Sequence, residues 1–355
     1  MKNIKKATIH IVIICVITSF FFSCNRTEKV VKHFPSVQEI NAIDIPINEI
    51  IKFGGIYKLK DYLILRDRAE SANVFFYVYK YPGFQFLYPF AEKGQGPDEY
   101  LQPIAVRSTS GNYFSFSDYG KNIFATFRLS DTENTLIYSS NMSPENGLYF
   151  NGINQVDDSL FLITRENLRW SRRDLINLYT NELIDSIPNT FDLEKILGKD
   201  YFTTFDATYT TSNNKRFAYG YLLIDLLEFG AIQNNKMIIT NRVGMKKAPE
   251  FHLDGRPGGR FRDNVLNNRV YYHGLTCGNK YVYALYLNIT WGDVPINEHI
   301  TFVEIYSWDG TPVTLLKLDK NISNFVVDEE RQIIYGFNYD VSEDYLHAFH
   351  FHIEE

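Results

Sequence analysis

The chain has 355 residues, of which 16% are aromatic, and its formal net charge is −6 at neutral pH. An acidic chain of this kind lacks the positive surface that phosphate backbones attract, so the composition argues against nucleic acid as a partner.

The N-terminal segment has the pattern of an export signal. Lys2, Lys5 and Lys6 precede an uninterrupted apolar run over residues 7–23. A membrane anchor is the alternative interpretation, but 17 residues are at the lower limit for crossing the hydrocarbon core. We therefore predict a signal peptide over residues 1–23.

The end of this run, Phe21-Phe22-Ser23-Cys24, resembles the lipobox of bacterial lipoproteins, although small residues are usual where Phe22 stands. The resemblance implies that Cys24 is lipidated and begins a mature protein anchored in the bacterial cell envelope, with the outer membrane as the expected location. Residues 24–35 would be the lipid-anchored linker. Loss of residues 1–23 removes three lysines and no acids, so the mature charge becomes −9. Cys277 would then be the one cysteine without a lipid, and no intramolecular disulfide is expected.

Short alternating runs of aromatic and β-branched residues fill the rest of the chain, and they indicate β-strands. One run of similar character recurs six times, as DYLILRD from 61, NYFSFSD from 112, DSLFLIT from 158, RFAYGYL from 216, KYVYALY from 280 and RQIIYGF from 331. Each is followed by a second alternating strand, and the first five by a third. With a short inner strand before each, the pattern predicts six units of four strands.

The sixth unit ends with the chain at Glu355 before its last strand, whereas the strand-like segment VQEINAIDIPI (37–47) belongs to no unit. A strand from one terminus would complete the blade built by the other and leave no open sheet edge. We therefore predict an all-β domain over residues 36–355: a six-bladed β-propeller of four-stranded antiparallel blades, closed by the N-terminal strand. A pair of packed sandwiches fits less well, because it predicts no near-constant period.

The unit YSWDGTPVTLLKLDKNISNFVVDEERQIIYGFN (306–338), together with the segment EKGQGPDEYLQP, resembles the TolB-like or NHL-like six-bladed propeller lipoproteins of bacteria with two membranes. The family pattern is matched at Gly94, Gly96, Pro97, Glu99, Tyr100 and Pro103. The resemblance covers the whole mature chain and implies a fold, a signal peptide and frequent lipidation. It implies no reaction, because propellers support many functions.

The segment GQGPDE (94–99) could be a phosphate cradle, an acid/base site or a joint between blades. It lacks the third glycine and the following helix of a dinucleotide site, and no P-loop lysine follows. Asp98 and Glu99 are sequence neighbours that need not face one another. We therefore predict a joint between the first blade and the second, with additional ligand contact as the alternative.

Long insertions suggest where a partner would bind. The connections over 190–203, which include a predicted short helix (190–202), and over 245–268 join an outer strand to the next inner strand, and residues 291–299 join the second strand of a unit to the third. In a propeller these two kinds of connection emerge on one face. The candidate ligand-binding residues on this face are Gln95, Asp98, Glu99, Arg256, Arg260, Arg262, Asp263, Trp291 and Asp293. Aromatic, arginine and carboxylate groups together suit sugars, peptides or anions.

The favoured function is a binding module tethered to the envelope, with a protein, peptide or glycan partner. The alternative is a metal-dependent hydrolase of the lactonase type, or a lyase, with its site at the centre of the ring. That alternative needs several metal ligands on inner strands, where the sequence offers Asn154, Asp157, His273 and Asp328 at scattered positions. His350 and His352 could share a metal only with a third ligand from elsewhere. No catalytic residue, metal ligand or cofactor is predicted.

Overall fold

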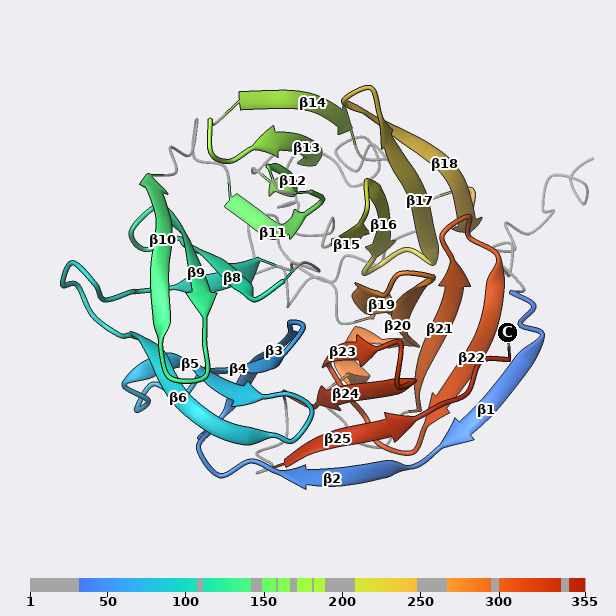
Figure 1. Ribbon diagram of the computed structural model, residues 1–355. Helices are drawn as coiled ribbons and strands as arrows, with labels where there is room; N and C mark the ends of the chain where they lie inside the picture. Colours follow the sequence, from blue (N-terminus) through green and yellow to red (C-terminus); the bar gives the residue numbers. More distant parts are fainter. Residues whose placement is uncertain are drawn as a thin grey trace, which may run out of the picture. The chain divides into compact units, whose positions relative to one another are not determined.

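The structure is a computed structural model, and it describes residues 32–106, 111–141, 149–157, 159–166, 171–180, 182–188, 208–247, 267–294, 300–339 and 345–354 (Figure 1). The predicted helix over residues 190–202 and the predicted signal peptide lie outside these ranges. No helix within the described ranges is long and apolar enough to cross a membrane.

The strands form six sheets, which are called blades 1 to 6 in chain order. Blade 1 contains β3 (Phe53–Lys58), β4 (Tyr62–Asp67), β5 (Val74–Lys80) and β6 (Gln85–Glu92). Blade 2 contains β7 (Pro103–Val106), β8 (Tyr113–Asp118), β9 (Ile123–Leu129) and β10 (Asn134–Asn141). Blade 3 contains β11 (Tyr149–Gln155), β12 (Leu160–Glu166), β13 (Ser171–Asn177) and β14 (Glu182–Pro188).

Blade 4 contains β15 (Thr208–Asn213), β16 (Arg216–Tyr221), β17 (Leu226–Gln233) and β18 (Lys236–Gly244). Blade 5 contains β19 (Arg269–Cys277), β20 (Tyr281–Thr290), the 3-10 helix η3 (Trp291–Asp293), β21 (Thr301–Ser307), β22 (Pro312–Leu318) and β1 (Ser36–Ile40). Blade 6 contains β23 (Asn324–Asp328), β24 (Ile333–Phe337), β25 (Tyr345–His350) and β2 (Ala42–Pro46).

The blades stand around a ring with their first strands innermost (Figure 1). Apolar side chains form a buried core between each pair of neighbouring blades. Between blades 1 and 2, the Phe76 ring lies 5.0 Å from Phe114 and 5.6 Å from Phe116. Between blades 6 and 1, Phe53 stacks on Phe337 at 5.0 Å. The continuous core explains why the middle strands are apolar on both faces: each blade is covered on both sides.

Two faces follow from this strand order. The turns from the first strand to the second, and from the third to the fourth, emerge on what we call the short-turn face. The connections from the second strand to the third, and from the fourth to the next blade, emerge on the long-loop face. On that face the backbone N–H of Trp291, after β20, donates to the carbonyl of Asn268, before β19, at 2.8 Å.

The aspartates that end the recurring strands of blades 1 and 2 have a structural role that the sequence analysis missed. The buried carboxylate of Asp67 accepts hydrogen bonds from the backbone N–H groups of Ile51 at 2.8 Å and Lys52 at 3.2 Å. Asp118 accepts from Leu101 at 2.6 Å and from the backbone N–H of the next residue at 3.2 Å. Each aspartate thus fixes the chain that enters the inner strand of its own blade.

The N-terminal segment closes the ring, as predicted. The predicted strand over residues 37–47 divides at Asn41. β2 pairs antiparallel with β25 and supplies the fourth strand of blade 6. β1 pairs parallel with β22 and adds a fifth strand to blade 5. One short segment therefore holds two blades together, with Ile40 buried between them.

Removal of β1 and β2 tests this closure. Deleting residues 36–46 removes two strand ladders and the buried Ile40, so we expect a loss of about 5 kcal/mol or more of unfolding free energy. The matched control deletes residues 25–31, which precede the compact unit that begins at Lys32. Denaturant unfolding followed by tyrosine and tryptophan fluorescence compares the two. Equal midpoints for the two truncations would show that the ring is closed in another way.

Candidate functional site

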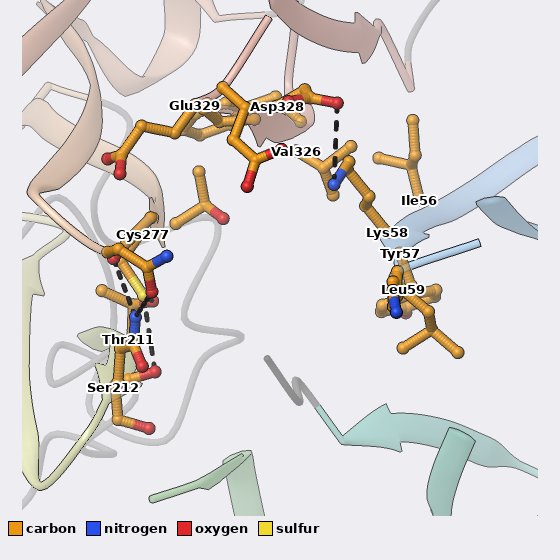
Figure 2. A pocket seen from close by; sticks show the side chains of 18 of the residues that line it. Ile56, Tyr57, Lys58, Leu59, Thr211, Ser212, Cys277, Val326, Asp328 and Glu329 are labelled. Carbon is orange, nitrogen blue, oxygen red and sulfur yellow. Dashed lines mark hydrogen bonds and ion pairs between the residues drawn. The ribbon is translucent and has the colours of Figure 1, made fainter. Parts of the chain in front are cut away.

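A pocket of about 390 Å³ opens where the inner strands end on the short-turn face. We call it the channel-mouth pocket. Its walls come from the ends of β3, β15, β19 and β23, with β7 and β8 of blade 2 completing the described lining. Figure 2 shows Lys58 and Asp328 on one side and Cys277, Thr211 and Ser212 on the other, with open space between them.

The first wall is a charged group at the junction of blades 6 and 1. The Lys58 Nζ lies 3.7 Å from an Asp328 carboxylate oxygen, and the guanidinium of Arg331 lies 3.0 Å from the same oxygen. The Tyr81 hydroxyl donates to this oxygen at 2.5 Å. Burial by itself raises the pKa of Asp328, but these hydrogen bonds and the Lys58 charge outweigh it and hold the pKa of the carboxyl below its usual value.

The second wall is Glu329, which follows β23. Its carboxylate accepts the backbone N–H groups of Lys280 at 2.8 Å and Tyr281 at 3.0 Å, and therefore fixes the turn between β19 and β20. A Cβ on Gly278 would lie 2.2 Å from a Glu329 carboxylate oxygen, so that position needs glycine for a close approach. Blades 5 and 6 are joined at the pocket rim through this contact.

The third wall carries uncharged polar groups of blades 4 and 5. The Thr211 hydroxyl donates to the Cys277 sulfur at 3.0 Å. The Asn213 side-chain amide donates to the Gly278 carbonyl at 3.0 Å. Cys277 is half-buried; it lines the pocket and also packs against the apolar core between blades 4 and 5.

The inner-strand residues considered as metal ligands do not converge. Of Asn154, Asp157, His273 and Asp328, the pocket lining includes Asp328. The Asp157 carboxylate is used locally, because it accepts the backbone N–H groups of Ser159 at 3.0 Å and of the following leucine at 2.9 Å. Within the described part of the chain, no three His, Cys, Asp or Glu side chains are grouped to hold a metal ion. His350 and His352 are exposed at the end of β25.

The segment over residues 94–99 is a joint between blades 1 and 2, as predicted. A Glu99 carboxylate oxygen accepts the backbone N–H of Gly96 at 2.7 Å, and the Lys121 Nζ donates to the Glu99 carbonyl at 2.5 Å. Tyr100 is buried, and its ring lies 4.7 Å from that of Phe116. The Glu99 carboxylate therefore stabilises the turn between the two blades.

Gln95 and Asp98 project from the same joint and are exposed. Asp98 and Glu99 line an open groove of about 660 Å³ between blades 1 and 2, whose apolar lining includes Phe90, Phe127 and Leu136. Ligand contact at this joint stays a prediction.

Trp291 and Asp293 lie on blade 5, away from that joint. Trp291 packs against a buried core that includes Leu222 and Val270, so part of its ring is used structurally. Asp293 is exposed. The candidates Arg256, Arg260, Arg262 and Asp263 lie outside the described residues, and their role stays a prediction.

Comparisons with known proteins agree with this architecture. The family model described as TolB-like 6-blade propeller-like matches residues 16–330. No curated protein matches the chain significantly. A structure of a Bacteroides fragilis protein described as exported aligns with a TM-score of 0.58 at 10% identity, over 90% of this chain and 100% of that one.

Two further structures align more weakly. The Cps50 β-propeller domain of Myceliophteria thermophila gives a TM-score of 0.49 at 10% identity, over 87% of this chain and 100% of that one. A luciferin-regenerating enzyme gives 0.49 at 8% identity, over 87% and 95%. At these identities the first alignment reflects a shared fold, and the other two carry no functional argument.

The neighbours Glu99 and Asp98 form a matched pair for testing the joint. Glu99→Ala removes the acceptor of the Gly96 N–H, and we expect a loss of about 1 kcal/mol in unfolding free energy. Asp98→Ala changes an exposed side chain, and we expect a change within about 0.5 kcal/mol. Urea unfolding of both variants measures the difference. The structural role of Glu99 would be rejected if the two variants were equally stable.

Proposed function

The chain belongs to the TolB-like six-bladed β-propeller family, and we propose that it is an exported, membrane-tethered binding module that takes an oxygen-rich ligand in the channel-mouth pocket. The observation that carries this proposal is the convergence of donors and acceptors from separate blades on one hollow. Propeller membership alone would not indicate a function.

The size and lining of the pocket support a small ligand, or one end of a larger one. A volume of about 390 Å³ is within the range usual for ligand sites. The lining combines the ammonium of Lys58 with the hydroxyl oxygens of Thr211 and Ser212, whose protons are donated to the Cys277 sulfur and the Gln155 carbonyl but whose lone pairs can still accept. Such groups bind hydroxyl and carboxylate oxygens, which favours a sugar or a peptide carboxylate.

The electrostatics of the pocket favour binding over acid/base catalysis. Asp328 and Glu329 are adjacent, but each carboxylate is already held by hydrogen bonds from its own surroundings. The Lys58 ammonium is less constrained, because 3.7 Å to Asp328 is longer than a hydrogen bond. Lys58 can therefore turn an N–H toward a ligand oxygen without breaking a strong contact.

Cys277 provides a reporter for the pocket, because the residue is half-buried and belongs to the lining. In a Cys24→Ser background it would be the single thiol of the mature chain. A panel of monosaccharides, sugar acids and short peptides is screened for compounds that slow alkylation of Cys277 by iodoacetamide. We expect at least one compound to protect the thiol, and Lys58→Ala to reduce this protection about tenfold in apparent affinity, as expected for loss of a charged hydrogen bond.

The control variant is Lys317→Ala, which removes an exposed lysine from β22, far from the pocket lining. A compound that protects Cys277 in the parent protein should protect it equally well in Lys317→Ala. Absence of protection by every compound, or equal protection with Lys58→Ala, would contradict a ligand site at the channel mouth.

Export and tethering form the second part of the proposal. They are supported by the basic and apolar residues 1–23, by Cys24 after them, and by the shared fold of the Bacteroides fragilis protein that is described as exported. Several acyl chains on Cys24 would give a stable anchor, whereas one chain binds membranes only marginally. The partner would then be an envelope protein, peptide or glycan.

Cys24→Ala tests the tether without touching the propeller. The parent protein should partition into the detergent phase of Triton X-114, and the variant should be released to the aqueous phase or remain unprocessed. Mass spectrometry of the mature N-terminus checks the modification directly. An unmodified N-terminal peptide in the parent protein would remove the lipid anchor from the proposal.

A further inference from the structure

Lys32 occupies a buried site between blades 4 and 5 that the proposed function does not use. The site consists of two carboxylates and three tyrosines, which we call the tyrosine cage: Asp225, Glu304, Tyr272, Tyr286 and Tyr306. Asp225 precedes β17 of blade 4, and the other four residues lie on β19, β20 and β21 of blade 5. The two blades are neighbours in the ring (Figure 1).

Each of the three N–H donors of the Lys32 ammonium has an acceptor in the cage. The Nζ lies 2.5 Å from an Asp225 carboxylate oxygen and 3.1 Å from a Glu304 oxygen, and it donates to the Tyr272 hydroxyl at 2.7 Å. A primary ammonium has three donors and no acceptor, and three acceptors surround it. The Tyr286 ring covers it with its centroid 4.0 Å away, within cation–π range.

The acceptors are themselves held in place. The Tyr272 and Tyr306 hydroxyls donate to the same Glu304 oxygen at 3.0 Å and 2.9 Å. The Tyr286 hydroxyl donates to Asp225 at 3.2 Å. The side chains of Lys32, Asp225 and Glu304 are 7%, 7% and 3% exposed, so the ion group is almost completely withdrawn from water.

Burial makes the cation necessary. Two carboxylates close together in an apolar interface are costly without a counter-charge. Burial raises the pKa of Glu304, with Lys32 opposing the rise and Asp225 adding to it. Without an ammonium, the cage would have to take up a proton or admit water.

We propose that the tyrosine cage is a binding site for primary alkylammonium groups, and that Lys32 is its built-in ligand, which latches the N-terminal tether onto the propeller. Lys32 lies four residues before β1, and Phe34 between them packs edge-on against Tyr306 at 5.4 Å. The latch therefore fixes the chain immediately before the strands that close the ring.

The arrangement predicts chemical selectivity. A trimethylammonium carries the same charge but no N–H, so it would leave three buried acceptors unpaired. A guanidinium is planar and wider, and its five donors in a fixed fork outnumber the three acceptors that surround the Lys32 ammonium. The cage should therefore prefer the end of a lysine side chain to either group.

With the proposed lipid on Cys24, the latch would also limit how far the propeller can lie from the membrane. Eight residue steps separate Cys24 from Lys32, which span at most about 29 Å. A filled cage would then keep the side of the propeller between blades 4 and 5 within that distance of the membrane.

Chemical rescue tests the site. Lys32→Ala empties the cage while leaving its walls intact, and we expect a thermal midpoint several degrees below that of the parent protein. Addition of n-butylammonium chloride at about 10 mM should raise the midpoint of Lys32→Ala, because the free amine can replace the missing side chain. The parent protein should respond much less, since its own Lys32 already fills the cage and the free amine would have to displace it. Butyltrimethylammonium chloride should raise the thermal midpoint of neither Lys32→Ala nor the parent protein.

Lys317→Ala is the matched control, because it also removes a lysine that pairs with a carboxylate, Glu39, but on the exposed face of β22. Its midpoint should not respond to n-butylammonium. If Lys32→Ala is not recovered in folded form, refolding is repeated with n-butylammonium present, and recovery that requires the amine supports the site. An equal response of all three proteins, rescue by butyltrimethylammonium, or no response of Lys32→Ala in either assay would overturn the proposal. None of these outcomes depends on ligand binding at the channel mouth.

Discussion

The structure depends on closing a ring of sheets whose chain begins and ends in neighbouring blades. A blade left with three strands would expose an unpaired edge and half-covered apolar side chains. The chain meets this constraint with eleven residues, Ser36–Pro46, which supply the fourth strand of blade 6 and a fifth strand of blade 5. The core between blades 6 and 1 is thereby as continuous as the others, and every blade is covered on both faces.

Closure also sets where the polar groups are placed. Two buried ion groups lie between blades and join elements distant in sequence: Arg173 of blade 3 lies 2.6 Å from Glu228 of blade 4, and Lys32 joins blades 4 and 5. At the junction of blades 6 and 1, Tyr81 donates to Asp328 at the pocket wall. The channel-mouth pocket and the tyrosine cage thus both form where neighbouring blades pack against one another.

The fold could be predicted from the sequence because its signals are local and repeated. Strands such as DYLILRD and NYFSFSD recur at intervals that reveal the repeat, and the strand-like segment over residues 37–47, which belongs to no repeat, indicates ring closure. The division of that segment at Asn41 and the parallel pairing of β1 could not be predicted, because they depend on where the edge of blade 5 lies. The joint at Glu99 was predicted. The hydrogen bond from the Gly96 N–H to the Glu99 carboxylate was not, because it depends on the geometry of the turn. Lys58 and Glu329 were missed, since their positions at one pocket follow from the convergence of inner strands whose ends are far apart in the chain.

Amide hydrogen exchange in the intact protein tests ring closure most directly, because it reports strand pairing without removing any residue. If β2 is an integral strand of blade 6, peptides covering Ala42–Pro46 and Tyr345–His350 should exchange together, at the slow rate of global unfolding. Fast exchange of Ala42–Pro46 with continued protection of Tyr345–His350 would contradict the account, because it would show that blade 6 is stable without the N-terminal strand.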